Sequence, residues 1–195
     1  MHLIQVVRRF GPVGGMEDIV WWICCGLADQ GLKVTVLCDE VCCSDGYKGR
    51  IVEFGTRAEK PRWLAHLRFS RQVRMWLGEN RSAHRIVHCH EMVPHADILT
   101  IHSTPHGIYE PTASLKKFDP TWHINRWLES KVIKTAKQVV PYTVSHSSQI
   151  SMMHPAAQSL LTTPVAPGTE ATNRHRVESR QAIGFMGREW ERKGL

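Results

Sequence analysis

The chain has 195 residues, of which 42% are hydrophobic and 22% charged, and this ordinary globular composition excludes a disordered, collagenous or coiled-coil protein. No apolar run reaches the ~20 residues that span a bilayer, and no secretory signal opens the chain, so we expect a cytoplasmic protein. The net charge of +7 lies in one segment, because residues 48–85 hold ten basic and three acidic residues while the rest holds fifteen of each.

The first forty residues alternate between strand and helix patterns. Residues 3–7 predict a buried strand, the apolar spacing of 16–30 predicts a helix that ends at Gly31, and 33–38 predict a second strand. A glycine loop containing Gly11, Gly14 and Gly15 joins the first strand to the helix. Strand, helix and strand in this order form a βαβ unit, which requires a parallel sheet.

The same alternation continues along the chain. It predicts strands at 50–54, 85–89, 97–101, 138–144 and 160–165, and helices at 61–78, 121–137 and 145–154. The expected fold class is therefore α/β, with a doubly wound, mostly parallel, Rossmann-like sheet. We expect a domain over 1–165, a polar linker over 166–180, and the truncated start of a second α/β domain over 181–195.

The glycine loop is the first candidate binding site. Ligands of open α/β sheets bind at the carboxyl ends of strands, and helix N-termini attract anions. Adjacent glycines such as Gly14 and Gly15 let the backbone approach a phosphate or a sugar closely. The loop matches neither GxGxxG nor GxxxxGK[ST], so a plain tight turn is the alternative.

Histidines gather at the ends of two predicted strands. His88, His90 and Glu91 end one strand, and His102 ends the next, so all of them open onto the same edge of the sheet. His88 and His90 would share a face of the strand while Cys89 points away. This pattern favours a histidine general base in a cleft, with a zinc-dependent hydrolase using His88, His90 and His102 as the alternative. The six cysteines follow no disulfide or CxxC spacing, so most are expected to be reduced and buried.

The helix predicted from Pro61 carries aromatic and basic residues side by side. Arg68, Arg71 and Arg74 interleave with apolar residues that include Trp76, which fits contact with an anionic membrane. The alternative is a helix packed on the core with a solvated basic face. Motifs typical of nucleic-acid binding are missing from the sequence, so we expect no nucleic-acid partner.

A final cationic motif lies near the end of the sequence. Arg188 and Lys193 follow a predicted strand and are five residues apart across a turn. A guanidinium can bind phosphate oxygens in bidentate fashion, and a lysine adds a point charge, so the pair could bind a phosphate; a charged loop is the alternative.

Together these motifs resemble one family. The loop 9–17, the strand ends 88–91 and 100–103, the segment 165–170 and the segment 184–195 are similar to the N-terminal half of a retaining glycosyltransferase of the GT-B fold, glycosyltransferase family 4. The family has two Rossmann-like domains that face each other across a cleft. The first holds the acceptor, and the second holds a nucleotide-activated sugar, commonly linked to UDP or GDP.

The resemblance also assigns roles to residues. It implies that Gly14 and Gly15 approach the donor diphosphate, that Arg188 and Lys193 neutralise it, and that His102 lies near the reacting sugar. His90, Glu91 and Glu170 are expected in the acceptor cleft, where Glu170 replaces the family's usual Asp. Neither a metal nor a cofactor is implied.

The resemblance implies a sugar transfer that retains the anomeric configuration, with a glycan, lipopolysaccharide or lipid-linked acceptor. Many family members bind membranes peripherally, so the cytoplasmic face of the inner membrane is the expected place. The family's downstream Glu-x7-Glu motif is not in this sequence, so the chain alone is expected to be inactive. The alternative function is a basic α/β module that binds membranes or anions without catalysis.

Overall fold

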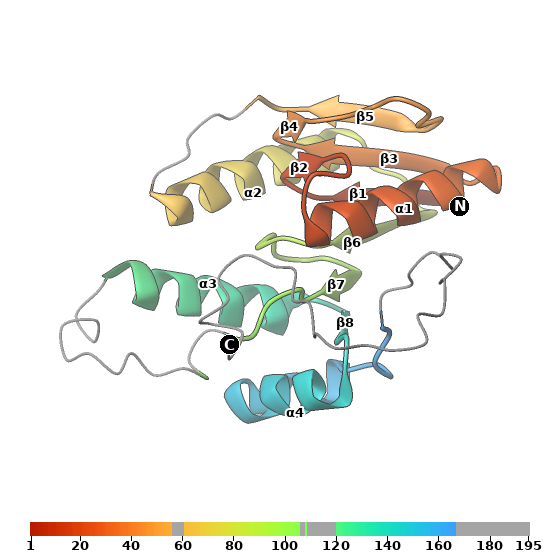
Figure 1. Cartoon of the computed structure of the whole chain (residues 1–195). Helices are drawn as coiled ribbons and strands as arrows, with labels where there is room; N and C mark the ends of the chain where they lie inside the picture. Colours follow the sequence, from red (N-terminus) through yellow and green to blue (C-terminus); the bar gives the residue numbers. More distant parts are fainter. Residues whose placement is uncertain (56–60, 106–107, 109–119, 167–195) are drawn as a thin grey trace, which may run out of the picture.

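The sheet confirms the doubly wound, parallel architecture. The computed structural model describes residues 1–55, 61–105, 108 and 120–166. Its six-stranded sheet has the order β5-β3-β1-β6-β7-β8, with every neighbouring pair parallel (Figure 1). The chain starts in the middle and winds outward in both directions, so the order reverses between β1 and β6. The strands are β1 (His2–Val6), β3 (Lys33–Cys38), β5 (Arg50–Glu53), β6 (Arg85–Cys89), β7 (Ile98–Thr100) and β8 (Gln138–Val140).

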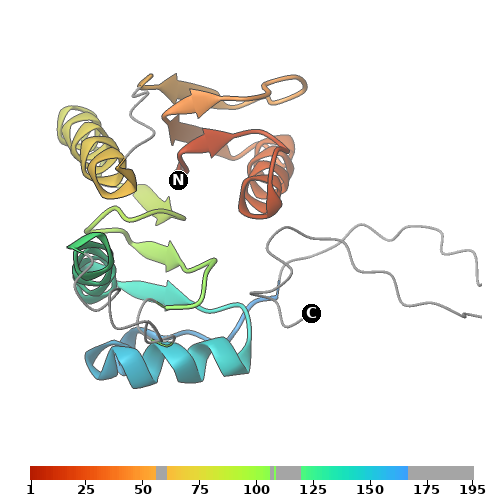
Figure 2. The same cartoon turned by 60° about the vertical axis from the view of Figure 1, so that its left-hand side comes forward.

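Helices cover the two faces of the sheet. Helix α1 (Gly15–Asp29) lies on one face, and α2 (Arg62–Glu79) and α3 (Pro120–Thr135) lie on the other (Figure 2). Helix α4 (Val144–Met153) and the 3-10 helix η2 (Pro155–Leu160) lie beyond β8. None of the helices in the described part of the chain is long and apolar enough to cross a bilayer.

The core has two parts because strand side chains alternate between the faces. Under α1, the side chains of Val20, Trp21 and Cys24 pack against the β3 residues Val34 and Val36. On the other face, the larger cluster joins α2 and α3 to the central strands through Phe69, Val73, Val132, Ile133, Ile4, Val6, Val87 and Leu99. All six cysteines are free thiols, and Cys24, Cys38 and Cys89 are buried.

Two predicted strands differ from the structure at the β8 edge. The strand expected over 138–144 ends at Val140, because Pro141 follows and Thr143 caps α4 by accepting the His146 backbone N–H at 3.0 Å. The strand expected over 160–165 is wrong. Leu161 makes only an isolated bridge to Val139, and the segment beyond it donates two scattered backbone bonds to β8 and Pro141. Proline residues on both segments lack the N–H that a regular ladder needs.

A short second sheet was not expected. Strand β2 (Arg9–Phe10) pairs in parallel with β4 (Glu40–Val41), directly after β1 and β3. The pair ties the glycine loop to the segment after β3, and Phe10 is fully buried against Trp21 and Tyr47. The path of the chain at the carboxyl edge of the sheet is therefore fixed by packing on both sides of the loop.

Candidate active site

The glycine loop leads directly into helix α1. Gly11 has φ +139°, and a Cβ there would lie 2.7 Å from the Cys43 backbone nitrogen, so only glycine fits this turn. Gly14 is the extended N-cap of α1, and a Cβ added at Gly15 would meet nothing within 4 Å. The first turn of α1 thus presents an open surface at Gly15, on the side where the strands end.

The histidines lie as the strand pattern predicts. The His88 and His90 rings contact each other at the end of β6, tilted by 44° with their centroids 4.1 Å apart, while Cys89 is buried in the core of the other face. His88 bonds Thr100 at 2.8 Å, and His90 bonds His102 from the next strand end at the same distance. The sheet therefore brings His88, His90 and His102 together.

Hydrogen bonds link four side chains that come from four neighbouring strands. Gln5 lies in β1, and His90, His102 and Tyr142 lie just after β6, β7 and β8. His90 Nε2 lies 2.9 Å from Gln5 Oε1, His90 Nδ1 lies 2.8 Å from His102 Nε2, and the Tyr142 hydroxyl contacts His102 Nδ1. Gln5 Oε1 can only accept, so His90 Nε2 carries the proton, and a neutral His90 must then accept at Nδ1. His102 consequently donates from Nε2, and its Nδ1 accepts the Tyr142 O–H.

Burial keeps this cluster uncharged near neutral pH. Burial lowers the pKa of His88 and that of His102 to about 4, and it lowers the pKa of His90 well below its ordinary value. Neutral rings are consistent with the tautomers assigned above, in which His90 accepts at Nδ1 and His102 donates from Nε2. His102 in this state orients neighbouring groups through hydrogen bonds and does not act as a cation.

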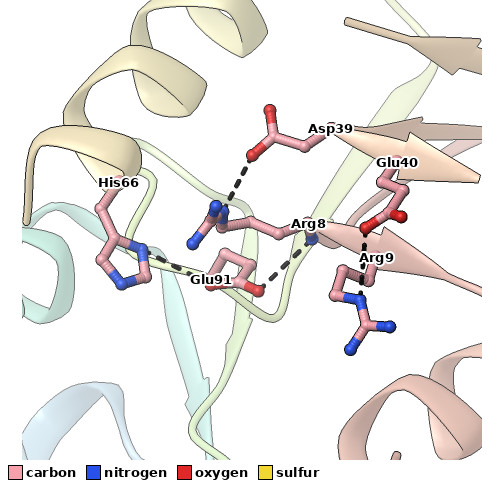
Figure 3. Close-up of polar contacts among 6 residues, drawn as sticks. All are labelled: Arg8, Arg9, Asp39, Glu40, His66 and Glu91. Carbon is pink, nitrogen blue, oxygen red and sulfur yellow. Dashed lines mark hydrogen bonds and ion pairs between the residues drawn. The ribbon is translucent and has the colours of Figure 1, made fainter. Parts of the chain in front are cut away.

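A second polar network surrounds Glu91, the residue after His90 (Figure 3). Arg8 Nε donates to Asp39 Oδ2 at 2.8 Å, and the Arg8 backbone N–H donates to Glu91 Oε1 at 3.3 Å. His66 of α2 lies with Nδ1 3.7 Å from Glu91 Oε2, an ion pair when its ring is protonated. Burial raises the pKa of Glu91 to about 7, against the opposing pull of Arg8. Glu91 is therefore a carboxyl group that can change its charge near neutral pH.

A hollow of about 270 Å³ connects these features. Met16 of α1, His66 of α2, and His90, Glu91 and His102 at the strand ends all line it, as do Asn125 and Glu129 of α3. Met16 follows Gly15 directly, so the start of α1 and the two polar clusters face one space. Apolar side chains line the hollow together with imidazole, carboxyl and amide groups, which is a typical composition for a small-molecule site.

The other predicted site residues lie elsewhere. Arg68, Arg71 and Arg74 are exposed on α2, whereas Trp76 is half-buried against the core with the Arg50 guanidinium 5.9 Å from its ring. Ala65, Phe69 and Val73 of the same helix are buried. The helix therefore packs on the core and keeps a basic outer face. Glu170, Arg188 and Lys193, and with them the predicted linker and second domain, lie outside the described residues.

Sequence reasoning missed several side chains of this site, including Asn125 and Glu129 of α3. Arg8 lies two residues after β1 and Asp39 directly follows β3, so the rule that identified the histidines, polar residues at strand ends, could have found them. Tyr142 was placed inside a predicted strand, and Gln5 lies within an apolar one. No sequence pattern pointed to His66 as a site residue, because its position depends on how α2 packs.

The described residues contain no group of three His, Cys, Asp or Glu side chains arranged to hold a metal ion. Instead, His88 bonds to Thr100, His90 bonds to Gln5 and to His102, and His102 also bonds to Tyr142. This arrangement gives the zinc alternative no support within that part of the chain.

Comparisons with known proteins agree with the fold. Residues 13–150 match the model of Glycosyltransferase Family 4, and no curated protein matches the chain by sequence. The structure resembles WaaG, a glycosyltransferase involved in lipopolysaccharide biosynthesis, with a TM-score of 0.69 and 12% identity over 82% of this chain and 44% of that one. It also resembles a glycosyltransferase from Rickettsia africae ESF-5, with a TM-score of 0.51 and 16% identity over 83% of this chain and 41% of that one.

At such identities the solved structures establish the fold alone, and this chain spans less than half the length of either. The sheet is that of the N-terminal, Rossmann-like domain of GT-B glycosyltransferases. The family model covers well over half of the chain. The chain belongs to glycosyltransferase family 4.

Proposed function

We propose that this chain forms the acceptor side of an enzyme that transfers a sugar from a UDP- or GDP-linked donor with retention of configuration. The acceptor would be a cell-surface glycan, a lipopolysaccharide or a lipid-linked sugar; WaaG, which shares the fold, is involved in lipopolysaccharide biosynthesis. The observation that carries the proposal is the hollow that opens between the start of α1 and the strand ends, within a family 4 domain.

The residues around the hollow would divide the work. Gly15 leaves room for the donor's diphosphate at the start of α1, where backbone N–H groups favour an anion. Arg188 and Lys193 would stabilise the charge that develops on the leaving diphosphate, so that the reaction needs no metal. Glu91, His90 and Glu170 would bind hydroxyl groups of the acceptor, and His102, held by His90 and Tyr142, would orient the reacting sugar.

Membrane contact is the less direct part of the proposal. The exposed guanidinium groups of Arg68, Arg71 and Arg74 would touch anionic headgroups on the cytoplasmic face of the inner membrane. Trp76 would contribute only its exposed part, because the rest of its ring packs on the core. The same basic face supports the second candidate, an anion-binding module without catalysis.

The decisive experiment changes one glycine of α1 and compares it with another. In the protein expressed from the complete reading frame, Gly15→Ala places a methyl group in the open space at the start of α1, one residue before Met16, which lines the hollow. The proposed donor diphosphate would occupy this space, so we expect at least a tenfold loss of sugar transfer. Gly26→Ala is the matched control, since its Cβ also meets nothing within 4 Å but lies far along the same helix. Both variants should melt at or above the wild-type temperature, because alanine favours a helix more than glycine does.

The outcomes separate the two candidates. Transfer that is lost in Gly15→Ala and in Arg188→Ala/Lys193→Ala, but kept in Gly26→Ala, supports the enzyme. If the Gly15→Ala variant transfers sugar with wild-type kinetics, the donor does not bind at the start of α1. A wild-type protein that transfers no sugar from any UDP or GDP donor, yet binds anionic vesicles, would favour the binding module.

A further inference from the structure

A second hollow lies at the opposite edge of the sheet from the candidate active site. It has a volume of about 780 Å³, and its wall includes Arg85 at the start of β6, Asp97 just before β7 and Lys137 just before β8. Parallel strands begin at the same edge, so these three residues lie at the amino ends of neighbouring strands. Because β6 has five residues, the two edges are ~15 Å apart along it.

The wall of this hollow is strongly cationic. Arg74, Arg81, Arg85 and Lys137 line it, and Asp97 is the one carboxylate among its described lining residues. Asp97 is already engaged, because its Oδ1 lies 2.6 Å from Lys137 Nζ and its Oδ2 accepts the Val87 backbone N–H at 2.8 Å. Three guanidinium groups therefore face the space with no carboxylate left to balance them.

One of these arginines is held in place by the fold. Arg85 Nη1 donates to the backbone oxygens of Leu77 and Asn80, at 2.8 and 2.7 Å, where α2 ends. The bonds cover the carbonyl groups at that helix end, whose partial negative charge would otherwise repel an anion. Arg74 and Arg81 are exposed and make no ion pair with the described part of the chain, so their guanidinium groups are available to a ligand.

The loop between β6 and β7 closes another side of the hollow. His95 lines it in a left-handed backbone conformation, φ 66°, and its backbone N–H donates to Thr135 Oγ1 at 3.1 Å. Thr135 Oγ1 in turn donates to the Lys131 backbone oxygen at 2.9 Å, which fixes the loop to the last turn of α3. The hollow is thus framed by the last turns of α2, the β6–β7 loop and three strand starts, and α3 holds that loop in place.

We propose that this hollow, the amino-edge pocket lined by Arg74, Arg81, Arg85, His95 and Lys137, binds a phosphate group. Guanidinium forks match the paired oxygens of a phosphate, and an ion of two negative charges suits an excess of three cations better than a single carboxylate does. The cations converge on one hollow, whereas a nucleic acid needs a track that follows its backbone. The proposal does not depend on sugar transfer, since the pocket lies away from the glycine loop.

Two double variants test the pocket with the same loss of charge. Arg74→Ser/Arg81→Ser removes two lining arginines, and Arg68→Ser/Arg71→Ser removes two exposed arginines of the neighbouring surface that do not line the hollow. Inorganic phosphate is titrated into each protein by calorimetry at constant ionic strength, with chloride as the balancing anion. We expect the wild type and the control to bind alike, and the pocket variant to lose about tenfold in affinity per arginine, as for one charge-assisted hydrogen bond each.

A second arm identifies the source of the phosphate. Sedimentation with phosphatidylcholine vesicles, with and without phosphatidic acid, is compared between the two double variants. Arg68 and Arg71 belong to the proposed membrane-contacting face, so some loss of vesicle binding is expected in the control as well. A vesicle loss that is clearly larger in the pocket variant than in the control assigns the site to a lipid headgroup, whereas equal vesicle losses with a phosphate loss confined to the pocket variant assign it to a soluble phosphorylated ligand. Equal losses of the two variants in both arms, or no binding of either probe by the wild type, would overturn the proposal.

Discussion

At the scale of single residues, Glu91 is where charge and structure are most closely coupled. Its carboxyl group is packed between the Arg8 backbone and His66, and burial raises its pKa from 4.5 to about 7. The folded protein therefore holds this proton more tightly than the unfolded chain does. The resulting stabilisation is complete at low pH and is lost as the pH rises from about 4.5 through 7.

Glu91→Gln should remove this pH dependence. We subtract the free energy of unfolding of the variant from that of the wild type. Between about pH 4.5 and pH 7 we expect this difference to fall by up to about 1.4 kcal/mol per pH unit. His88 and His102 have lowered pKa values and so act with the opposite sign, but both proteins contain them and their effect cancels. Urea unfolding at stepped pH measures the difference, with the exposed Glu40→Gln as control. If the difference in unfolding free energy between wild type and Glu91→Gln does not change with pH, burial does not raise the pKa of Glu91.

Several residues of the site could be predicted from the sequence, and others could not. His90, Glu91 and His102 follow strands, and the rule that parallel strands end at one edge brought them together correctly. Gln5 could not be found this way, because its contact with His90 depends on β1 lying beside β6, in the register that pairs Gln5 with His88. Sequence periodicity predicts that strands exist but does not predict which of them are neighbours.

At the scale of elements, a buried contact between a histidine and a carboxyl group links α3 to the end of α4. His154, the residue that ends α4, lies with Nε2 3.0 Å from Glu129 Oε1, and both side chains are at most 5% exposed. His154→Leu would leave a buried carboxylate without this partner, so we expect it to lower the free energy of unfolding by about 3 kcal/mol.

The double variant Glu129→Leu/His154→Leu provides the control for that loss. It removes the charge along with its partner, so chemical denaturation should find it more stable than the single His154→Leu variant. A double variant that is less stable than the single one would show that the side chains contribute mainly through other contacts.

The elements themselves were predicted best where they are long and periodic. Helices α1, α2 and α4 begin and end within about two residues of the predicted limits. The failures are elements of two residues and a segment that contains proline. The two-residue strands β2 and β4 have no detectable period, and the segment after η2 has apolar residues typical of a strand but prolines that prevent a ladder.

At the scale of the whole molecule, the basic outer face of α2 governs encounters with anionic surfaces. Replacing Arg68, Arg71 and Arg74 by Ser should weaken binding to phosphatidylglycerol vesicles by about 1 kcal/mol per charge, and added salt should reduce the difference. Vesicle sedimentation at low and high salt is the measurement. If the wild-type protein does not bind such vesicles at low salt, membrane contact is not part of its function.

The position of β1 has a consequence for the growing chain on the ribosome. This strand is made before both of its partners, β3 and β6, and β6 ends at residue 89. At roughly ten residues per second, one edge of β1 stays unpaired for several seconds of synthesis. The α1 cluster needs only residues 7–51 and can pack early, whereas the cluster under α2 and α3 must wait for β8 and α4. We therefore expect a half-sheet intermediate whose open edge is a natural target for a chaperone.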